Sequence, residues 1–321
     1  MPFLLIAGVL VVSLLAGCST TDRQRATSND DSPRYWSTTD LSRFRRSTEP
    51  GTGHTVLTSP ELKAPIQWDE LVLSWNGHVP AGSGLKFEVR ALASERNSEF
   101  YTMGYWAEDT AEQLRESVTG QKDEDGDVQT DTLSLKWLAD RYQLRITFLG
   151  TNASARPRLR YVGASFLNTK KNFPAQPPNK LAWGRGLPVP ERSQLSDPGG
   201  RDWCSPTSVS MVLAYWSAVL KRPELNVELA DAAGGIYDKN WPGTGNWSFN
   251  AAFAGKFDGM RAYVTRLADV AELETWVTAR VPPVVSVSYD LLHGRKQKQS
   301  NEHLVVCIGF TEKGDAIIND P

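Results

Sequence analysis

A cysteine at the expected start of a helix, with a histidine and an aspartate far downstream, is the combination in this chain that could do chemistry. Cys204 lies in the stretch Trp203-Cys204-Ser205-Pro206-Thr207-Ser208, and His303 and Asp320 follow on two strand-like segments. The positive end of a helix and a neighbouring imidazolium both favour the thiolate, which is the nucleophilic form of cysteine. The order therefore predicts a nucleophile, a base and a group that orients the base.

The elements around these residues can be predicted from apolar spacing and helix-end signals. Apolar residues recur at helical spacing over 209–220, Pro206 falls in the first turn, where a missing N–H costs nothing, and Pro223 ends the helix. The other elements expected here are a helix over 227–233, a helix over 270–280 capped by Asp269 and Glu272, a strand over 283–288, and a hairpin of residues 302–310 and 315–320.

The hairpin gives a geometric prediction. If Phe310 and Asp315 close its turn, Val305 opposes Asp320 across the ladder, and His303 lies on the same face as Val305. His303 and Asp320 are then diagonal neighbours, within reach of each other. A one-residue change of register would place them on opposite faces of the sheet.

The N-terminus predicts export and a lipid anchor. Residues 3–15 are almost wholly apolar, too few to span a bilayer comfortably, and end in Leu15-Ala16-Gly17-Cys18, which resembles a bacterial lipobox. The resemblance implies that residues 1–17 are a signal peptide, cleaved before Cys18, and that the Cys18 thiol is diacylated. Ser19 in place of aspartate favours the outer membrane or cell surface of a bacterial cell envelope. A simple secretory signal is the alternative.

Of the three cysteines, Cys204 and Cys307 remain once Cys18 is assigned to lipidation. A disulfide between them is one option in an exported protein. Cys307 lies within an apolar strand-like run, where a buried thiol behaves as a small hydrophobic residue. We therefore predict that Cys307 belongs to the core and that Cys204 is the reactive thiol.

The rest of the chain divides by composition. Residues 18–54 are rich in Ser, Thr, Asp and Arg and predict a disordered tether. Residues 55–168 alternate apolar with polar side chains, which predicts an all-β sandwich. Residues 169–190 are proline-rich and predict a linker, or a strap laid across the next domain. Residues 191–321 mix helix and strand.

The motifs around the three reactive residues resemble those of a known family. The cysteine stretch, Glu302-His303-Leu304-Val305-Val306 and Ile318-Asn319-Asp320-Pro321 are similar to the bacteriocin-processing (double-glycine) peptidase-like group of papain-clan cysteine peptidases, in its secreted lipoprotein branch. The resemblance covers about residues 180–321 and implies a papain-like fold with no cofactor. Because the group usually continues beyond this point, we expect the sequence to be a fragment.

The same resemblance implies a glutamine whose side-chain amide joins the cysteine N–H in an oxyanion hole. Gln194 is the candidate, although ten residues separate it from Cys204, which is longer than the usual spacing. Residues 195–201 would have to loop out for Gln194 to reach the site. The aromatic residues Trp203, Trp241 and Trp247 are weaker candidates for walls of a substrate cleft, and simple packing explains them equally well.

Other functional classes receive little support from the sequence. The formal net charge of −2 gives no support for a positively charged surface that would bind nucleic acid. Asp123, Asp125 and Asp127 imitate the start of a calcium loop, but no glutamate follows at the required place, so we expect a turn and no metal. The tryptophans and tyrosines of the β-rich half could stack on sugars, which leaves contact with carbohydrate or cell wall open.

The sequence therefore predicts an α+β protein in which a papain-like cysteine peptidase domain follows an all-β sandwich. We expect a lipid-anchored peptidase of the cell envelope that hydrolyses peptide bonds in peptide or protein substrates. Two alternatives remain open at this stage. The same residues could serve an amidase or acyltransferase, or the chain could be a surface-binding lipoprotein without catalytic activity.

Overall fold

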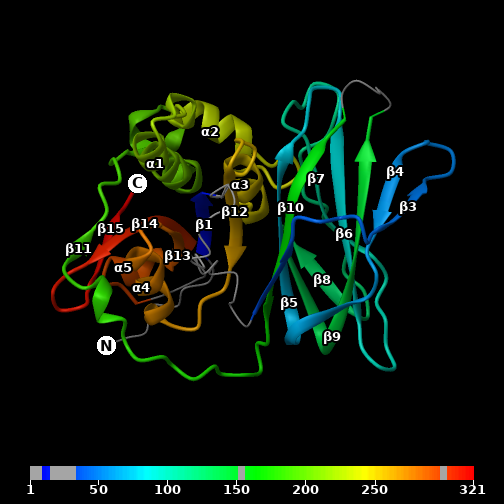
Figure 1. The fold of residues 1–321 in the computed structure, drawn as a ribbon, viewed down its shortest axis with the longest axis horizontal. Coiled ribbons are helices and arrows are strands. Elements are labelled where there is room, and N and C mark those ends of the chain that lie inside the picture. Colours follow the sequence, from blue (N-terminus) through cyan, green and yellow to red (C-terminus); the bar gives the residue numbers. More distant parts are fainter. Residues whose placement is uncertain (1–8, 15–33, 151–155, 297–301) are drawn as a thin grey trace, which may run out of the picture.

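The computed structural model describes residues 34–150, 156–296 and 302–321, together with the strand formed by residues 9–14. Its two parts stand side by side, a β-rich N-terminal domain on the right of Figure 1 and a mixed helix and sheet domain on the left. The all-β and α+β predictions for the two parts are confirmed.

The N-terminal domain is a single curled sheet. Nine strands of the described residues join it, with β2-β10-β5-β9-β4-β3 as its main path. Off this path, β6 and β8 pair with β9, and β7 pairs with β6. The long strands β5 and β9 bend where their pairing shifts, so the sheet folds over itself and encloses a core without splitting in two. Its strands are β2 (Tyr35–Thr38), β3 (Arg45–Thr48), β4 (Thr55–Thr58), β5 (Leu62–His78), β6 (Gly84–Leu92), β7 (Tyr101–Trp106), β8 (Gly126–Gln129), β9 (Thr132–Leu149) and β10 (Arg158–Leu167).

The domain begins earlier than the sequence pattern suggested. Residues 34–54, assigned to a disordered tether, carry the strands β2 and β3, while residues 18–33 lie outside the described residues. The expectation failed because backbone pairing holds these polar strands: β2 pairs with β10, and β3 with β4. Arg34 is also buried, with its guanidinium 2.5 Å from the Glu272 carboxylate of the other domain.

The C-terminal domain packs helices against an antiparallel sheet with the order β11-β14-β13-β1-β12, and β15 pairs with β14. The capped helix is confirmed, since the Asp269 side chain accepts a hydrogen bond from the Glu272 N–H. The elements of this domain are β11 (Arg185–Gly186), α1 (Cys204–Leu220), α2 (Leu229–Ile236), α3 (Trp247–Ala254), β12 (Met260–Thr265), α4 (Val270–Thr278), β13 (Val284–Ser288), α5 (Tyr289–Leu292), β14 (Glu302–Phe310) and β15 (Ala316–Asn319).

Part of the apolar N-terminal run lies in this sheet. The strand β1 (Val9–Leu14) pairs antiparallel with β12 on one side and with β13 on the other. In Figure 1 it is the dark blue strand among the later elements of the chain. The sequence pattern instead predicts that residues 1–17 are a signal peptide outside the fold. Cleavage before Cys18 stays a prediction, and Cys18 itself lies outside the described residues.

The proline-rich segment between the domains is a strap across the C-terminal domain. The Asn179 N–H donates to the Glu274 carboxylate at 2.5 Å, and Trp183 Nε1 donates to the same carboxylate at 2.7 Å. The segment then adds β11 to β14. Of the two alternatives that the sequence left open for residues 169–190, the structure shows the strap.

The two domains share a buried, hydrogen-bonded seam where β5 lies against α3 and β12. The Asn76 side chain accepts from Ala262 N at 2.9 Å and donates to Ala262 O at 2.7 Å, as a neighbouring strand would do. Ser74 Oγ accepts from Val264 N at 2.9 Å. These side chains satisfy backbone groups of β12 that would otherwise be buried without partners.

Aromatic packing closes the same seam. Phe249 of α3 enters the core of the N-terminal domain, where its ring centroid lies 6.2 Å from that of Trp75 and 5.4 Å from that of Trp106. A Cβ on Gly104 would stand only 3.2 Å from the Phe249 ring, and Gly104 has a φ of +152°. Glycine therefore makes room for a side chain of the other domain.

Replacing Asn76 by alanine is expected to lower the free energy of unfolding by about 2–4 kcal/mol, because two buried backbone groups lose their partners. Urea unfolding of the full chain measures the change. Asn172→Ala, at an exposed position of the strap, is the control and should be close to neutral. A loss for Asn76→Ala no larger than that of the control would show that the seam does not depend on this amide.

Candidate active site

Cys204 is the first residue of α1 and is half-buried. The first N–H groups of a helix have no partner within it, so the thiol lies at the positive end of the helix dipole. Ser208 Oγ donates to Leu304 O at 3.0 Å, which ties the first turn of α1 to the strand that carries His303. Ser205 Oγ is hydrogen-bonded to Asn250 Oδ1 of α3 at 2.7 Å.

The hairpin brings His303 and Asp320 together, with His303 Nε2 2.6 Å from Asp320 Oδ1. The expected pairing at the turn is wrong by one residue, because Phe310 faces Ala316 rather than Asp315. A bulge between Cys307 and Gly309 then restores the expected register, so Val306 pairs with Asn319. Asp320, the next residue, therefore reaches the face of His303.

The His303 ring also contacts the Cys204 thiol. Burial by itself lowers the pKa of His303, but hydrogen bonds to Cys204 and Asp320 outweigh it, so this pKa lies above its usual value. Since Nε2 faces Asp320, Nδ1 is left for the thiol. A histidine that holds its proton beside a thiol stabilises the thiolate, and in its neutral form it can accept the thiol proton.

Tyr289 also contacts the site, although the sequence analysis did not single it out. Its ring meets the His303 ring edge-on, with a centroid distance of 5.3 Å and an interplanar angle of 88°. It begins the short helix α5, directly after β13, which pairs with β14. No sequence signal marks this tyrosine, because its proximity depends on the pairing of two strands.

Gln194 reaches the same cavity as Cys204 in spite of the long spacing. Its N–H donates to Pro321 O at 2.9 Å, next to Asp320, and its Nε2 donates to Arg201 O at 2.6 Å. The intervening residues loop out between two short 3-10 turns, Gln194–Ser196 and Gly200–Asp202. A Cβ on Gly200 would lie 1.7 Å from Gln194 O, so only glycine allows this loop to close.

A cavity of about 990 Å³ opens in front of the thiol, between the two domains. Cys204, His303, Gln194, Tyr289, Trp241 and Trp247 line it from the C-terminal domain, and Glu70 and residues 129–132 line it from the N-terminal domain. Trp203, which was also expected at the cleft, does not line it. Its indole packs beneath Gly199 in the preceding loop.

Carboxylates at the cleft wall come from both domains. Burial raises the pKa of Asp131 to about 6, although Trp247 N donates a hydrogen bond to its carboxylate at 2.5 Å. Glu70 forms an ion pair with Arg266 at 3.0 Å. Burial also raises the pKa of Glu302, the neighbour of His303 in sequence, and Arg266 opposes this effect.

Cys307 is buried in β14, and burial raises the pKa of its thiol to about 12. Both Cys204 and Cys307 are free thiols, so the disulfide that the sequence left open is not formed. A neutral buried thiol is a poor nucleophile. Among the free cysteines that the structure describes, Cys204 is therefore the one placed for reaction.

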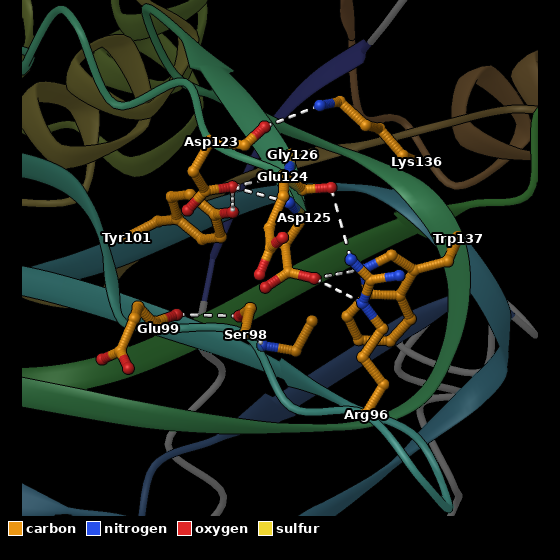
Figure 2. A network of polar contacts seen from close by, with 11 residues as sticks. Arg96, Ser98, Glu99, Tyr101, Asp123, Glu124, Asp125, Gly126, Lys136 and Trp137 are labelled. Atoms are coloured by element: carbon orange, nitrogen blue, oxygen red, sulfur yellow. Dashed lines mark hydrogen bonds and ion pairs between the residues drawn. The ribbon is translucent and has the colours of Figure 1, made fainter.

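Two of the three aspartates that imitate a calcium loop, Asp123 and Asp125, are engaged by protein donors, as Figure 2 shows. Asp123 Oδ1 accepts from Tyr101 Oη at 2.5 Å and from Gly126 N at 2.9 Å. Asp125 Oδ1 accepts from Arg96 Nε at 2.5 Å and from Trp137 Nε1 at 3.0 Å. These carboxylates organise the turn that leads into β8, and over the described residues no group of three or more His, Cys, Asp or Glu could hold a metal ion.

Taken together, the helix that bears the thiol and the sheet that bears the histidine define a papain-like α+β domain. Comparison with protein families agrees. Residues 186–321 match the model of the Peptidase_C39 like family, and residues 20–166 match that of the Peptidase C39 N-terminal domain. The two matches are consistent with a papain-clan peptidase-like protein of the C39 type, and they support a function of the cysteine peptidase type. A search of curated proteins finds no match.

Asp320→Asn should make His303 titrate at lower pH, because the carboxylate is one of the groups that raise its pKa. With a folded-state pKa above that of the unfolded chain, His303 contributes its full stabilisation at low pH and loses it as the pH rises through the folded-state pKa. In Asp320→Asn this loss should be smaller and should be complete at a lower pH, because only the folded-state pKa changes. NMR titration of the His303 ring measures the shift.

Asp315→Asn, an exposed position of the same hairpin, is the matched control. An unchanged titration of His303 in Asp320→Asn would contradict the electrostatic role of this carboxylate.

Proposed function

We propose that this protein is a cysteine peptidase that hydrolyses peptide bonds with Cys204 as nucleophile, His303 as base and acid, and Asp320 as the group that orients His303. The observation that carries the proposal is the meeting of three side chains from α1 and the β14–β15 hairpin. The His303 ring contacts the thiol and lies 2.6 Å from Asp320.

The reaction follows from this arrangement. The Cys204 thiolate attacks the carbonyl carbon of the scissile bond and forms a tetrahedral oxyanion. The C–N bond then breaks, the amine leaves with the proton of the His303 imidazolium, and a thioester remains on Cys204. Water attacks the thioester as His303 takes its proton, and the carboxylic acid product leaves with the thiol restored.

Gln194 and the Cys204 N–H are the proposed donors to the oxyanion. The Gln194 amide is held at the cavity by its bond to Arg201 O, and its Oε1 is buried without a hydrogen-bond partner. An amide nitrogen carries two hydrogens, so Nε2 keeps one for the substrate. Donors fixed in advance stabilise a developing charge without reorganisation.

Cys204→Ala is expected to abolish hydrolysis, and Gln194→Ala to lower kcat about 10²–10³-fold while the fold is retained. Peptide products identified by mass spectrometry, with stability from urea unfolding, test both variants. Gln176→Ala, which changes an exposed glutamine of the strap, is the control.

Iodoacetamide should alkylate Cys204 faster than it alkylates a free thiol near neutral pH. A rate no faster than that of the free thiol would favour a binding protein without activity.

We further propose that the chain is anchored in the bacterial cell envelope through Cys18. The support is the lipobox-like stretch Leu15-Ala16-Gly17-Cys18 after an apolar run. None of the helices in the described part of the chain is both long and apolar enough to cross a bilayer. Cleavage before Cys18 would also remove β1 from the mature chain.

Metabolic labelling with an alkyne analogue of palmitate tests the anchor. The wild-type chain is expected to take up the label and to fractionate with membranes, and Cys18→Ala to lose both properties. Cys204→Ala is the matched control, since it removes a different thiol and should keep the label. Equal labelling of Cys18→Ala and wild type would refute lipidation at this residue.

A further inference from the structure

The turn between β8 and β9 brings part of the N-terminal domain to the cavity of the thiol. Gln129 pairs with Thr132 across this two-residue turn, and residues 129–132 and Ser134 line the same cavity as Cys204. Gln129 is exposed, while Thr130 and Thr132 are half-buried. Part of the cleft wall is therefore built by a domain that carries none of the proposed catalytic residues.

The turn has a backbone conformation that its sequence does not favour. Thr130 has a φ of +58°, a left-handed value that is rare for a β-branched residue and is usually left to glycine or asparagine. Such strained positions gather at active sites and ligand clamps, where the surrounding structure holds them.

Contacts with the C-terminal domain hold this turn in place. The Asp131 carboxylate accepts from Trp247 N at 2.5 Å and from Thr132 Oγ1 at 3.1 Å. Beside it, the ion pair of Glu70 with Arg266 joins the same two domains at 3.0 Å. The turn is therefore a fixed wall of the cleft rather than a mobile loop.

The two walls differ in chemistry. The turn presents amide and hydroxyl groups, which can donate to and accept from a peptide backbone. The loop that contains Trp241 lines the same cavity and presents an indole that is 45% exposed. With a volume of about 990 Å³, the cleft reaches the upper end of the size range of ligand pockets. A small amide at Cys204 would leave most of this space empty.

We propose that the β8–β9 turn of the N-terminal domain is a substrate-binding element, and that the natural substrate is an extended polypeptide segment held between this turn and the Trp241 loop. The inference rests on the proposed function of Cys204 and adds to it the substrate class and a specificity element. Gln129 is the specificity-determining side chain, because it is the exposed residue of the turn.

Two substitutions of Gln129 test whether the turn is part of the substrate site. The measured quantity is the rate at which Cys204 is labelled by a randomised mixture of peptidyl vinyl sulfones, with iodoacetamide as a small reference reagent. Gln129→Trp narrows the cleft and should slow labelling by the peptidyl probes at least tenfold while iodoacetamide reacts within twofold of wild type. Gln129→Lys should shift the preference towards probes with acidic residues at least fivefold. Thr119→Trp and Thr119→Lys, exposed in the same domain and outside the cavity, are the controls.

If both Gln129 variants label like the Thr119 controls, the turn is not part of the substrate site. A wild-type protein that cleaves small amides but reacts with no extended peptidyl probe would also overturn the inference, while leaving the thiol chemistry intact. If Cys204 is unreactive even towards iodoacetamide, the proposed function fails instead.

Binding can be tested without catalysis. In the Cys204→Ala background, a photoreactive benzoylphenylalanine at position 129 should cross-link peptides from a proteome-derived mixture, and the same group at position 119 should not. Equal cross-linking at the two positions would overturn the inference whether or not the protein is an active enzyme.

Discussion

The cleft in front of Cys204 depends on how β5 of the N-terminal domain is joined to β12 of the C-terminal domain. The Asn76 side chain pairs with both backbone groups of Ala262 and so takes the place of a neighbouring strand. Phe249, in the helix α3 that precedes β12, packs into the aromatic core of the N-terminal domain. A buried backbone N–H or C=O that loses its hydrogen-bond partner costs free energy. Because separating the domains would break these bonds, the seam fixes the distance between the domains. The cleft in front of Cys204 is the space that the seam leaves open.

Within the cleft, two opposing effects set the pKa of the His303 ring. Removing His303 from water disfavours its charged form, whereas the contacts with Cys204 and Asp320 favour it, and the contacts prevail. The same hairpin that supplies Asp320 also holds Gln194 through Pro321 O. The end of one short strand therefore positions both Asp320, which contacts His303, and the proposed oxyanion donor Gln194. Gly200 provides the room that this arrangement requires.

Local signals in the sequence were sufficient for much of this architecture. The helix after Cys204, the Asp269 cap and the strand of His303 could be predicted because apolar spacing and capping residues act over a few positions. The bulge after Cys307 could not be predicted in this way. It offsets the one-residue difference between the expected and the observed pairing at the turn, and so keeps His303 and Asp320 on one face. Residues 34–54 were misjudged as a tether because pairing with distant strands replaces the apolar content that a sequence pattern looks for. Tyr289 and the β8–β9 turn reach the site only through tertiary packing, which leaves no local trace.

The exchange of side chains across the seam has a consequence for how such proteins can change. Gly104 leaves room for the Phe249 ring of the other half of the chain, and this ring packs against Trp75 and Trp106. Neither half would keep a closed interior if it were transplanted onto an unrelated neighbour. The two halves are therefore expected to be inherited together, and changes in the half without Cys204, His303 and Asp320 can still alter the wall of the shared cleft.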